Sequence, residues 1–184
     1  MDSALQVLMN RRSVRSFESK QISEEELNQI VSAGLQAATA LGSQSWYLTV
    51  VQDQQFLKEI SEATASALYD SEVPSLQERS RQANFSPFHN APTVIFVSST
   101  DSLYSIADCA NACQNMTLAA TALNLGSCYI GSFVQGLKHP KGRDLVKKFE
   151  LPEGYSPLFA VAIGTVKGEL PPLKSREWKV NYIR

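Results

Sequence analysis

Apolar residues along the chain follow two alternating patterns. One pattern repeats at three- and four-residue spacing, as a helix face requires, and predicts helices around residues 5–9, 27–38, 57–68, 109–123 and 145–149. The other is a short continuous run rich in β-branched residues, and it predicts strands at residues 46–51, 93–98, 127–130 and 158–163. Helices and strands alternate after the second helix, and alternation alone favours a doubly wound parallel sheet.

Local signals indicate where several helices begin and end. Ser23 and Glu26 have the spacing of a capping box, so we expect a helix to begin directly after Ser23. Gly42 is expected to stop that helix, and Gly126 is expected to stop the alanine-rich helix that follows Cys109. Because alanine side chains are small, this second helix should pack closely against its neighbours and lie near the centre of the fold.

Two segments fit neither pattern well. The polar stretch Asp70–Asn90, with Pro74 and Pro87, has weak periodicity. We expect it to be a partly helical excursion and a candidate lid or partner contact. The end of the chain carries Trp178 and Tyr182, which make it too apolar to remain in solvent. We therefore expect this tail to pack on its own subunit or on a partner.

Composition narrows the class of protein. The chain has 184 residues, of which 43% are hydrophobic and 19% charged, as in ordinary globular domains. Lys and Arg number 17 against 18 Asp and Glu, a net charge of −1, so there is no basic surplus for nucleic acid. No apolar run approaches the roughly 20 residues of a membrane span. We therefore expect a single domain, residues 1–184, with neither nucleic acid nor a membrane as partner.

The three cysteines favour a reduced environment. Cys109, Cys113 and Cys128 are an odd number in a mid-sized chain, which does not indicate a disulfide framework. Cys109 and Cys113 would share one helix face and could bind a metal, but His89 and His139 lie at no ligand spacing. Buried thiols that act as small apolar side chains are the favoured interpretation, with no metal site. The first helix also lacks the apolar core of a signal peptide, so we expect a cytoplasmic protein.

Two basic clusters stand near opposite ends of the chain. The run Arg11–Arg15 contains three arginines and a serine, and Lys174–Arg176 contains a lysine and an arginine. Guanidinium groups match phosphate oxygens in bidentate fashion, so each cluster is a candidate anion site. The alternatives are a solvated helix end, stabilised by the helix dipole, and an ordinary charged tail. If the two clusters meet in the fold, together they would hold a phosphate.

A third feature is the glycine-bracketed strand Gly126–Gly131. Glycine lets a backbone approach a ligand closely, although a plain strand with turn glycines explains the same residues. No strand is followed by the glycine-rich phosphate turn of a dinucleotide or mononucleotide fold, so those functions lack support.

These features occur together in a known family. The sequence resembles the nitroreductase family of FMN-dependent oxidoreductases along nearly its whole length. The resemblance begins with the run Arg11–Phe17 and the helix from Glu26 to Ala38. It continues through segments in the same order as in the family: Gln44-Ser45-Trp46, Ala91-Pro92-Thr93-Val94-Ile95, Gln114-Asn115-Met116 with Leu125-Gly126-Ser127, Gly164, and Lys174-Ser175-Arg176. Any one of these matches is weak, but their common order is specific.

The resemblance implies a fold and an activity. The fold would be α+β, a mixed and largely antiparallel sheet surrounded by helices, in an intertwined homodimer with two FMN sites at its interface. Residues 170–184 would pack on the partner subunit. The activity would be the reduction of nitroaromatics, quinones or related small-molecule acceptors by NAD(P)H through FMN, in a ping-pong hydride mechanism. The alternative from another class is a non-catalytic flavin-binding protein that stores or senses FMN.

The resemblance also implies roles for residues at the phosphate end of FMN. Arg11, Lys174 and Arg176 would bind the phosphate. Ser13 would contact the phosphate or the ribityl chain, with Arg12 nearby.

At the flavin ring, Arg15 would approach the N1/O2 edge, where a cation stabilises the reduced anionic ring. Gln44 would contact the flavin and Asn84 the pyrimidine edge. The strand Tyr129-Ile130-Gly131 would lie against the ring, with a backbone amide donating to N5. No catalytic acid or base is expected, because the flavin carries the hydride chemistry. His89 is either part of this pocket or an ordinary surface histidine.

The chain departs from the family pattern near Gln44. The family commonly has an asparagine where this chain has Gly42, and prolines where it has Ala38 and Ser45. The resemblance therefore implies that one polar contact to the flavin or ribityl chain is missing at position 42.

Overall fold

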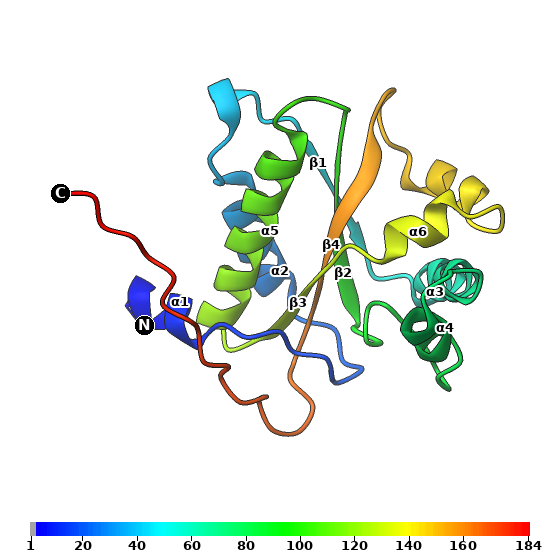
Figure 1. Ribbon diagram of the computed structural model, residues 1–184, viewed down its shortest axis with the longest axis horizontal. Helices are drawn as coiled ribbons and strands as arrows, with labels where there is room; N and C mark the ends of the chain where they lie inside the picture. The colour runs from blue at the N-terminus through cyan, green and yellow to red at the C-terminus, as the bar shows by residue number, and fades with distance from the viewer. Residues whose placement is uncertain (1–2) are drawn as a thin grey trace.

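A computed structural model of the chain describes residues 3–184, and it has a central sheet between two layers of helices (Figure 1). The four strands are β1 (Trp46–Val51), β2 (Thr93–Ser99), β3 (Gly126–Ile130) and β4 (Ser156–Gly164). Their order across the sheet is β1-β2-β4-β3, and every pair of neighbours is antiparallel. The α+β class is confirmed.

The doubly wound parallel sheet that the alternation favoured is wrong. Strands β2 and β3 do run in the same direction, since each pairs antiparallel with β4. However, β4 is the last strand in the chain, and it inserts between them. The helical connection from β2 to β3 therefore joins two strands that never pair with each other, and no parallel ladder forms.

One face of the sheet is covered by α2 (Glu24–Leu35) and α5 (Ser105–Ala122), with α1 (Ala4–Asn10) at the end of α5 (Figure 1). The stripe of α5 that was predicted to be central is buried at Cys109, Ala112, Cys113, Met116 and Ala120, and partly buried at Ala119 and Leu123. All three cysteines are buried free thiols, so the favoured interpretation of them as small apolar side chains is confirmed.

The opposite face is covered by α3 (Gln54–Tyr69), α4 (Pro74–Ser80), α6 (Phe133–Lys138) and the 3-10 helix η2 (Arg143–Phe149) (Figure 1). Its core contains an aromatic cluster in which Phe96 packs edge-to-face on Phe133 and Phe149, with ring centroids 5.1 and 4.9 Å apart. Helix α4 confirms the partly helical excursion expected in residues 70–90. Helix α6 was not predicted, because its six residues are too few to display a helical period.

The helix boundaries agree with the sequence signals at the start and differ at the end. Ser23 and Glu26 form the predicted capping box, in which the Glu26 carboxylate accepts the Ser23 N–H at 2.8 Å. Helix α2 then ends at Leu35 rather than at Gly42, and Asn115 of α5 donates to the Ala33 carbonyl in its last turn. A side chain distant in sequence therefore contributes to the end of α2.

The second predicted stop is also wrong in position. Helix α5 ends at Ala122, and Asn124 takes the left-handed φ of 59° that turns the chain out of the helix. Asparagine is one of the few residues that enters this region at low cost. Gly126 is then free to be the first residue of β3.

After β4 the chain has no further helix or strand, and its end runs away from the body of the molecule (Figure 1). Trp178 is 80% exposed and Ile183 is 94% exposed in the single chain. Among residues 3–184, no helix is both long enough and apolar enough to cross a membrane.

Candidate functional site

The N-terminal arginine segment is hydrogen-bonded to the edge of the sheet. Ser13 forms a single parallel bridge with Ser127 of β3, and the Val14 N–H donates to the Ser127 carbonyl at 2.8 Å. Gly126 makes this close approach possible, since a Cβ at that position would lie only 2.9 Å from Cγ1 of Val14. The bridge therefore fixes Ser13 and its flanking arginines beside the start of β3.

The chain that leaves β4 runs beside the same segment. Phe17 pairs with Val166, and the Glu18 N–H donates to the Thr165 carbonyl at 2.9 Å. Farther along, one guanidinium nitrogen of Arg12 donates to the Pro171 carbonyl at 3.0 Å. These contacts direct the C-terminal tail past the N-terminal arginines.

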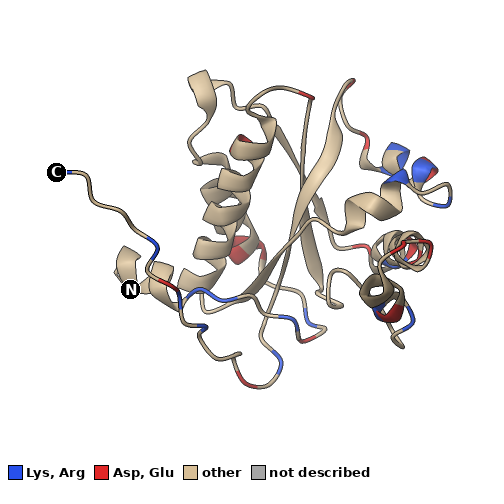
Figure 2. Ribbon diagram, in the orientation of Figure 1, with Lys and Arg blue, Asp and Glu red and all other residues tan. Residues whose placement is uncertain are grey.

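Figure 2 shows the basic residues of the tail passing beside the N-terminal arginine segment. The two basic clusters consequently meet in one cavity of about 600 Å³. We call this the basic cavity. It is lined by Leu8, Met9, Arg11, Arg12, Ser13 and Arg15 from the N-terminal side, and by Pro171, Pro172, Leu173, Lys174 and Arg176 from the tail. The sequence left open whether these clusters meet, and the structure brings them together.

The cations of the basic cavity have no acidic partners in the described part of the chain. Among the described residues, no carboxylate lines the cavity. Within residues 3–184, no ion pair involves Arg11, Arg15 or the two tail cations, Lys174 and Arg176. Unneutralised cations that face one another repel, so this arrangement favours the binding of an anion.

A second cavity of about 420 Å³ adjoins the first at Arg15, whose side chain lines both. We call this the strand cavity. It is lined by Arg15, Arg79, Pro87, His89, Cys128, Tyr129, Ile130, Gly131 and Ser132. It therefore combines the glycine-bracketed strand with two arginines and a histidine, and none of the carboxylates that the structure describes lines it.

The charges around the strand cavity determine the state of its titratable groups. Burial, together with the nearby Arg15 and Arg79, lowers the pKa of His89 from 6.5 to about 4. His89 is therefore a neutral imidazole at neutral pH. Burial raises the pKa of the Cys128 thiol in spite of the same arginines, so Cys128 remains protonated and is not a nucleophile.

The end of β3 leaves room for a flat ligand against its backbone. Gly131 is exposed, and a Cβ built there would lie 3.7 Å from the Phe159 ring, which is ordinary van der Waals contact. The fold itself therefore does not require glycine at position 131. What the absent side chain does provide is open backbone beside the strand cavity.

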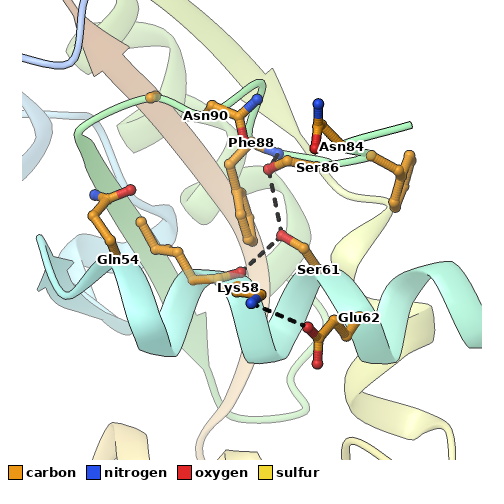
Figure 3. Close-up of a pocket in the computed structure, with 11 residues that line it drawn as sticks. Gln54, Lys58, Ser61, Glu62, Asn84, Ser86, Phe88 and Asn90 are labelled. Carbon is orange, nitrogen blue, oxygen red and sulfur yellow. Dashed lines mark hydrogen bonds and ion pairs between the residues drawn. The ribbon is translucent and has the colours of Figure 1, made fainter. Parts of the chain in front are cut away.

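Asn84 lies in a different cavity. This third cavity, of about 330 Å³, is bounded by α3 and the loop that precedes β2, and its other residues include Ser61, Ser86 and Lys58 (Figure 3). The Ser61 hydroxyl donates to the Ser86 hydroxyl at 3.3 Å, whereas Asn84 points away from α3 (Figure 3). The structure therefore does not bring Asn84 into either cavity that Arg15 lines.

Gln44 is far from both basic clusters in the single chain. It follows a short 3-10 turn, η1 (Ala40–Gly42), at the opposite end of α5 from the N-terminal arginines (Figure 1). Its backbone φ is +47°, and its N–H donates to the Thr39 hydroxyl at 3.3 Å. Gln44 is exposed and lines none of the three cavities described above.

Asp108 anchors the loop that carries Gln44. This carboxylate is 2% exposed and accepts the Ala40 N–H at 3.0 Å. It also accepts the hydroxyls of Ser43 and Ser45, at 3.2 and 3.3 Å. The loop is therefore held in one conformation, in which position 42 has a φ of +65°. Glycine and asparagine both enter this region readily, so the asparagine that the resemblance implies at position 42 is compatible with this backbone.

Sequence reasoning missed Arg79 and Asp108. Arg79 stands in a polar stretch without clear periodicity, and nothing in its neighbours indicates that α4 would bring it to β3. Asp108 stands in the first turn of α5, where an acidic residue is ordinarily a surface group that complements the helix dipole. No sequence signal separates these two residues from the other charged residues of the chain.

Comparisons with known proteins agree with this geometry. The nitroreductase family model matches residues 8–165. An FMN reductase (NADPH) of Bacillus subtilis is 25% identical over 183 residues, covering 94% of this chain and 71% of that protein. The structure of a nitroreductase with bound FMN from Bacteroides fragilis is 30% identical, with a TM-score of 0.90 over 100% of this chain and 99% of that one. A nitroreductase with bound FMN from Desulfitobacterium hafniense is 26% identical, with a TM-score of 0.91 over 100% of both chains.

Proposed function

The chain belongs to the nitroreductase family, and we propose that it reduces nitroaromatics, quinones or related small acceptors with NAD(P)H by a ping-pong mechanism. It is an FMN-dependent NAD(P)H oxidoreductase, the activity that its relatives' names describe. The observation that supports the proposal most strongly is that two basic clusters from opposite ends of the chain meet in a cavity that no carboxylate of residues 3–184 lines.

The donor set of the two adjoining cavities fits FMN. The basic cavity offers guanidinium, ammonium and hydroxyl donors, as a phosphate requires. The strand cavity offers open backbone at Gly131 beside the apolar surfaces of Ile130 and Pro87, as a flat ring requires. An elongated ligand with a phosphate at one end and a ring at the other would pass Arg15, which lines both cavities.

We therefore assign residues to the two ends of FMN. Arg11, Lys174 and Arg176 would bind the phosphate, and Ser13 would contact the phosphate or the ribityl chain. Arg12 stays nearby, with part of its guanidinium already donating to the Pro171 carbonyl.

At the ring end, Arg15 would stand at the N1/O2 edge and supply a positive charge there. Tyr129, Ile130 and Gly131 would lie against the ring, with one of their backbone amides directed to N5. The exposed backbone at Gly131 supports this assignment.

The residues of the chain would bind and orient the cofactor and the substrates, and they would not transfer protons. When bound, FMN supplies the hydride chemistry, taking a hydride from NAD(P)H and giving one to the acceptor. His89 is neutral because its pKa is lowered to about 4, and the Cys128 thiol stays protonated. Neither group is poised as a general acid at neutral pH. Reductant and acceptor would both reach the flavin ring through the strand cavity, which supports their alternate use of one site.

We further propose that the working unit is a homodimer with two FMN sites at its interface. In the single chain, Gln44 and Asn84 lie outside both cavities that we assign to FMN, so a second copy is the simplest source of such contacts. The tail also exposes apolar side chains, among them Trp178 and Ile183, that would gain stability by packing on a partner. Residues 170–184 would then be the segment that crosses to the other subunit.

One experiment tests the cofactor, the activity and the dimer together. Protein purified with added FMN should keep a flavin absorption spectrum after gel filtration and elute as a dimer. Anaerobic NADH or NADPH should bleach that spectrum, and a nitroaromatic or menadione should restore it. Protein that retains no flavin after reconstitution would contradict the cofactor assignment. A bleached spectrum that no acceptor restores would support the non-catalytic alternative.

A further inference from the structure

Arg79 projects a second positive charge into the strand cavity from an element outside the family's basic motifs. It stands on α4 and is partly buried, with its guanidinium carbon 5.8 Å from the centre of the Phe85 ring. Within residues 3–184 it has no ion pair. An arginine stacked on an aromatic ring is held in place while its N–H donors remain free for another group.

His89 lies in the same cavity and is held there by a constrained turn. Its backbone has a φ of +55°, and the following Asn90 has the same value. The His89 N–H donates to the Ser86 carbonyl at 3.1 Å, and the Ala91 N–H donates to the Phe88 carbonyl at 3.1 Å. Asn90 enters the left-handed region at low cost, but His89 does not, and such backbone strain is often found at functional sites.

The two cavities contain more positive charge than the phosphate of FMN can neutralise. A phosphate monoester carries about −2 at neutral pH. The cations that line the cavities are Arg11, Arg12, Arg15, Arg79, Lys174 and Arg176. No carboxylate among residues 3–184 lines either cavity, so these residues leave an excess of positive charge at the strand cavity after FMN is bound.

We propose that Arg79 and His89 form a second anion-binding subsite at the strand cavity, which recognises a phosphate or carboxylate on the molecule that exchanges electrons with FMN. Arg79 provides the charge, and the His89 imidazole provides a hydrogen bond without adding a further cation. The inference rests on the proposed function, because it concerns the substrate that enters beside the cofactor.

The anion has two possible sources with the same chemistry. It can be the 2′-phosphate that distinguishes NADPH from NADH, or a carboxylate on the electron acceptor. The first source predicts a preference for NADPH that depends on Arg79. The second predicts a preference for 4-nitrobenzoate over the uncharged 4-nitrotoluene that depends on the same residue.

Arg79→Gln is the informative variant, and Arg81→Gln is its matched control. Arg81 lies two residues away, and it also stacks on an aromatic ring, with its guanidinium carbon 5.3 Å from the centre of Tyr69. Arg81 lines neither the basic cavity nor the strand cavity. Arg79→Lys serves as the conservative variant, because it keeps the charge and loses the planar fork.

The measured quantity is a ratio of kcat/KM values, taken on FMN-saturated protein at low ionic strength. The NADPH-to-NADH ratio reports the first source, and the 4-nitrobenzoate-to-4-nitrotoluene ratio reports the second. One charge-assisted contact is worth about 1.4 kcal/mol or more, so Arg79→Gln should lower one of the two ratios about tenfold. Arg79→Lys should restore most of that loss, and Arg81→Gln should change neither ratio.

Measurements of FMN affinity and of NAD(P)H oxidation distinguish the ways in which the inference can fail. Flavin fluorescence gives the Kd of FMN for each variant, and a loss confined to FMN affinity would overturn the subsite by making Arg79 a cofactor ligand. FMN binding and NAD(P)H oxidation with both ratios unchanged in Arg79→Gln would overturn this inference alone. Absence of FMN binding in the unaltered protein would instead overturn the proposed function, and the inference with it.

Discussion

The Asp108 carboxylate and the cations of the basic cavity differ in whether the chain supplies their partners. The Asp108 carboxylate is 2% exposed, and its hydrogen-bond donors, at Ala40, Ser43 and Ser45, all belong to the same chain. The cations of the basic cavity are partly or fully exposed and face one another, and no acidic residue in the described part of the chain pairs with them. The chain itself supplies the hydrogen-bond donors of Asp108, whereas the cations of the basic cavity require an anion from outside the chain.

The difference separates a structural charge from a binding charge. A buried carboxylate with all its partners supplied by the chain stabilises a local conformation, and removing it leaves those partners unsatisfied. A cluster of like charges costs folding energy and gains stability only when a ligand neutralises it. Substitutions in the two regions should therefore affect different measurements.

The largest effect should come from the basic cavity and should appear in FMN affinity. The double variant Arg11→Ala with Arg176→Ala removes two charge-assisted contacts to the phosphate, each worth about 1.5 kcal/mol at such partly exposed positions. The Kd of FMN should therefore rise about a hundredfold. Fluorescence titration of the FMN-free protein measures this value.

The same double variant should leave the fold intact. Since it relieves repulsion between cations, the free energy of unfolding without FMN should stay within about 0.5 kcal/mol of the original or rise. Arg81→Ala with Arg143→Ala removes the same charge outside the cavity and is the control. A comparable loss of FMN affinity in that control would mean that net charge, not the cavity, binds the phosphate.

The next largest effect should come from Asp108 and should appear in folding. Asp108→Ala leaves the Ala40 N–H and the two serine hydroxyls without their acceptor, so we expect about 2–3 kcal/mol of destabilisation in urea unfolding. Asp108→Asn keeps one acceptor oxygen and should lose less. Limited proteolysis should also detect faster cleavage near Gln44. Asp101 is exposed, and Asp101→Asn is the control. A loss of stability in Asp101→Asn equal to that in Asp108→Asn would contradict the anchoring role.

A smaller effect should come from the open backbone of the strand cavity. Gly131→Ala is compatible with the fold, because its Cβ would make only ordinary contact with the Phe159 ring. If the flavin ring lies against this backbone, the added methyl group should raise the Kd of FMN about tenfold through overpacking. Thermal unfolding of the FMN-free variant should be unchanged. Unaltered FMN affinity would place the ring elsewhere.

The smallest effect should be a pH dependence of stability that arises at His89. Its pKa is lowered from 6.5 to about 4 in the folded chain, so below pH 6.5 the unfolded chain binds a proton that the folded chain does not. Stability should therefore be complete above pH 6.5 and fall progressively as the pH approaches 4. Because His89 is only half-buried, solvent screening limits the loss to about 1 kcal/mol.

Urea unfolding of His89→Gln from pH 7 to pH 4.5 measures this contribution. The variant should lose less stability over this range than the original protein, while groups elsewhere contribute equally to both. Arg79→Gln should lie between the two, since Arg79 is one of the cations that lower the pKa of His89. Identical slopes in all three proteins would contradict the electrostatic description of the strand cavity.

Local sequence signals predicted local structure well. The capping box at Ser23 and Glu26 starts α2 because both partners lie within one turn. The strand Thr93–Ser99 was recognisable as a continuous apolar run, and it is buried along its entire length between two helical layers. Helix α6 was not predicted, because six residues display too little periodicity. The end of α2 was misplaced, because Asn115, distant in sequence, contributes to it.

The candidate site was predictable in its parts but not in its assembly. The arginines near residue 11 and the cations near residue 174 were visible as separate clusters, each with an ordinary alternative. Only the resemblance to a family connected them to one ligand. Arg79 had no such signal, because its position beside β3 depends on how a polar excursion folds back over the sheet.

The sequence by itself determined the short-range features of this protein. These are the strands, the main helices, the start of α2, the family and the two clusters of cations, all of which depend on neighbouring residues. The tertiary structure decided which of these features meet. The insertion of β4 between β2 and β3 made the sheet antiparallel, and the pairing of Ser13 with Ser127 and of Phe17 with Val166 brought the tail to the arginines. Such contacts depend on sheet order and long-range packing, which no local pattern of residues encodes.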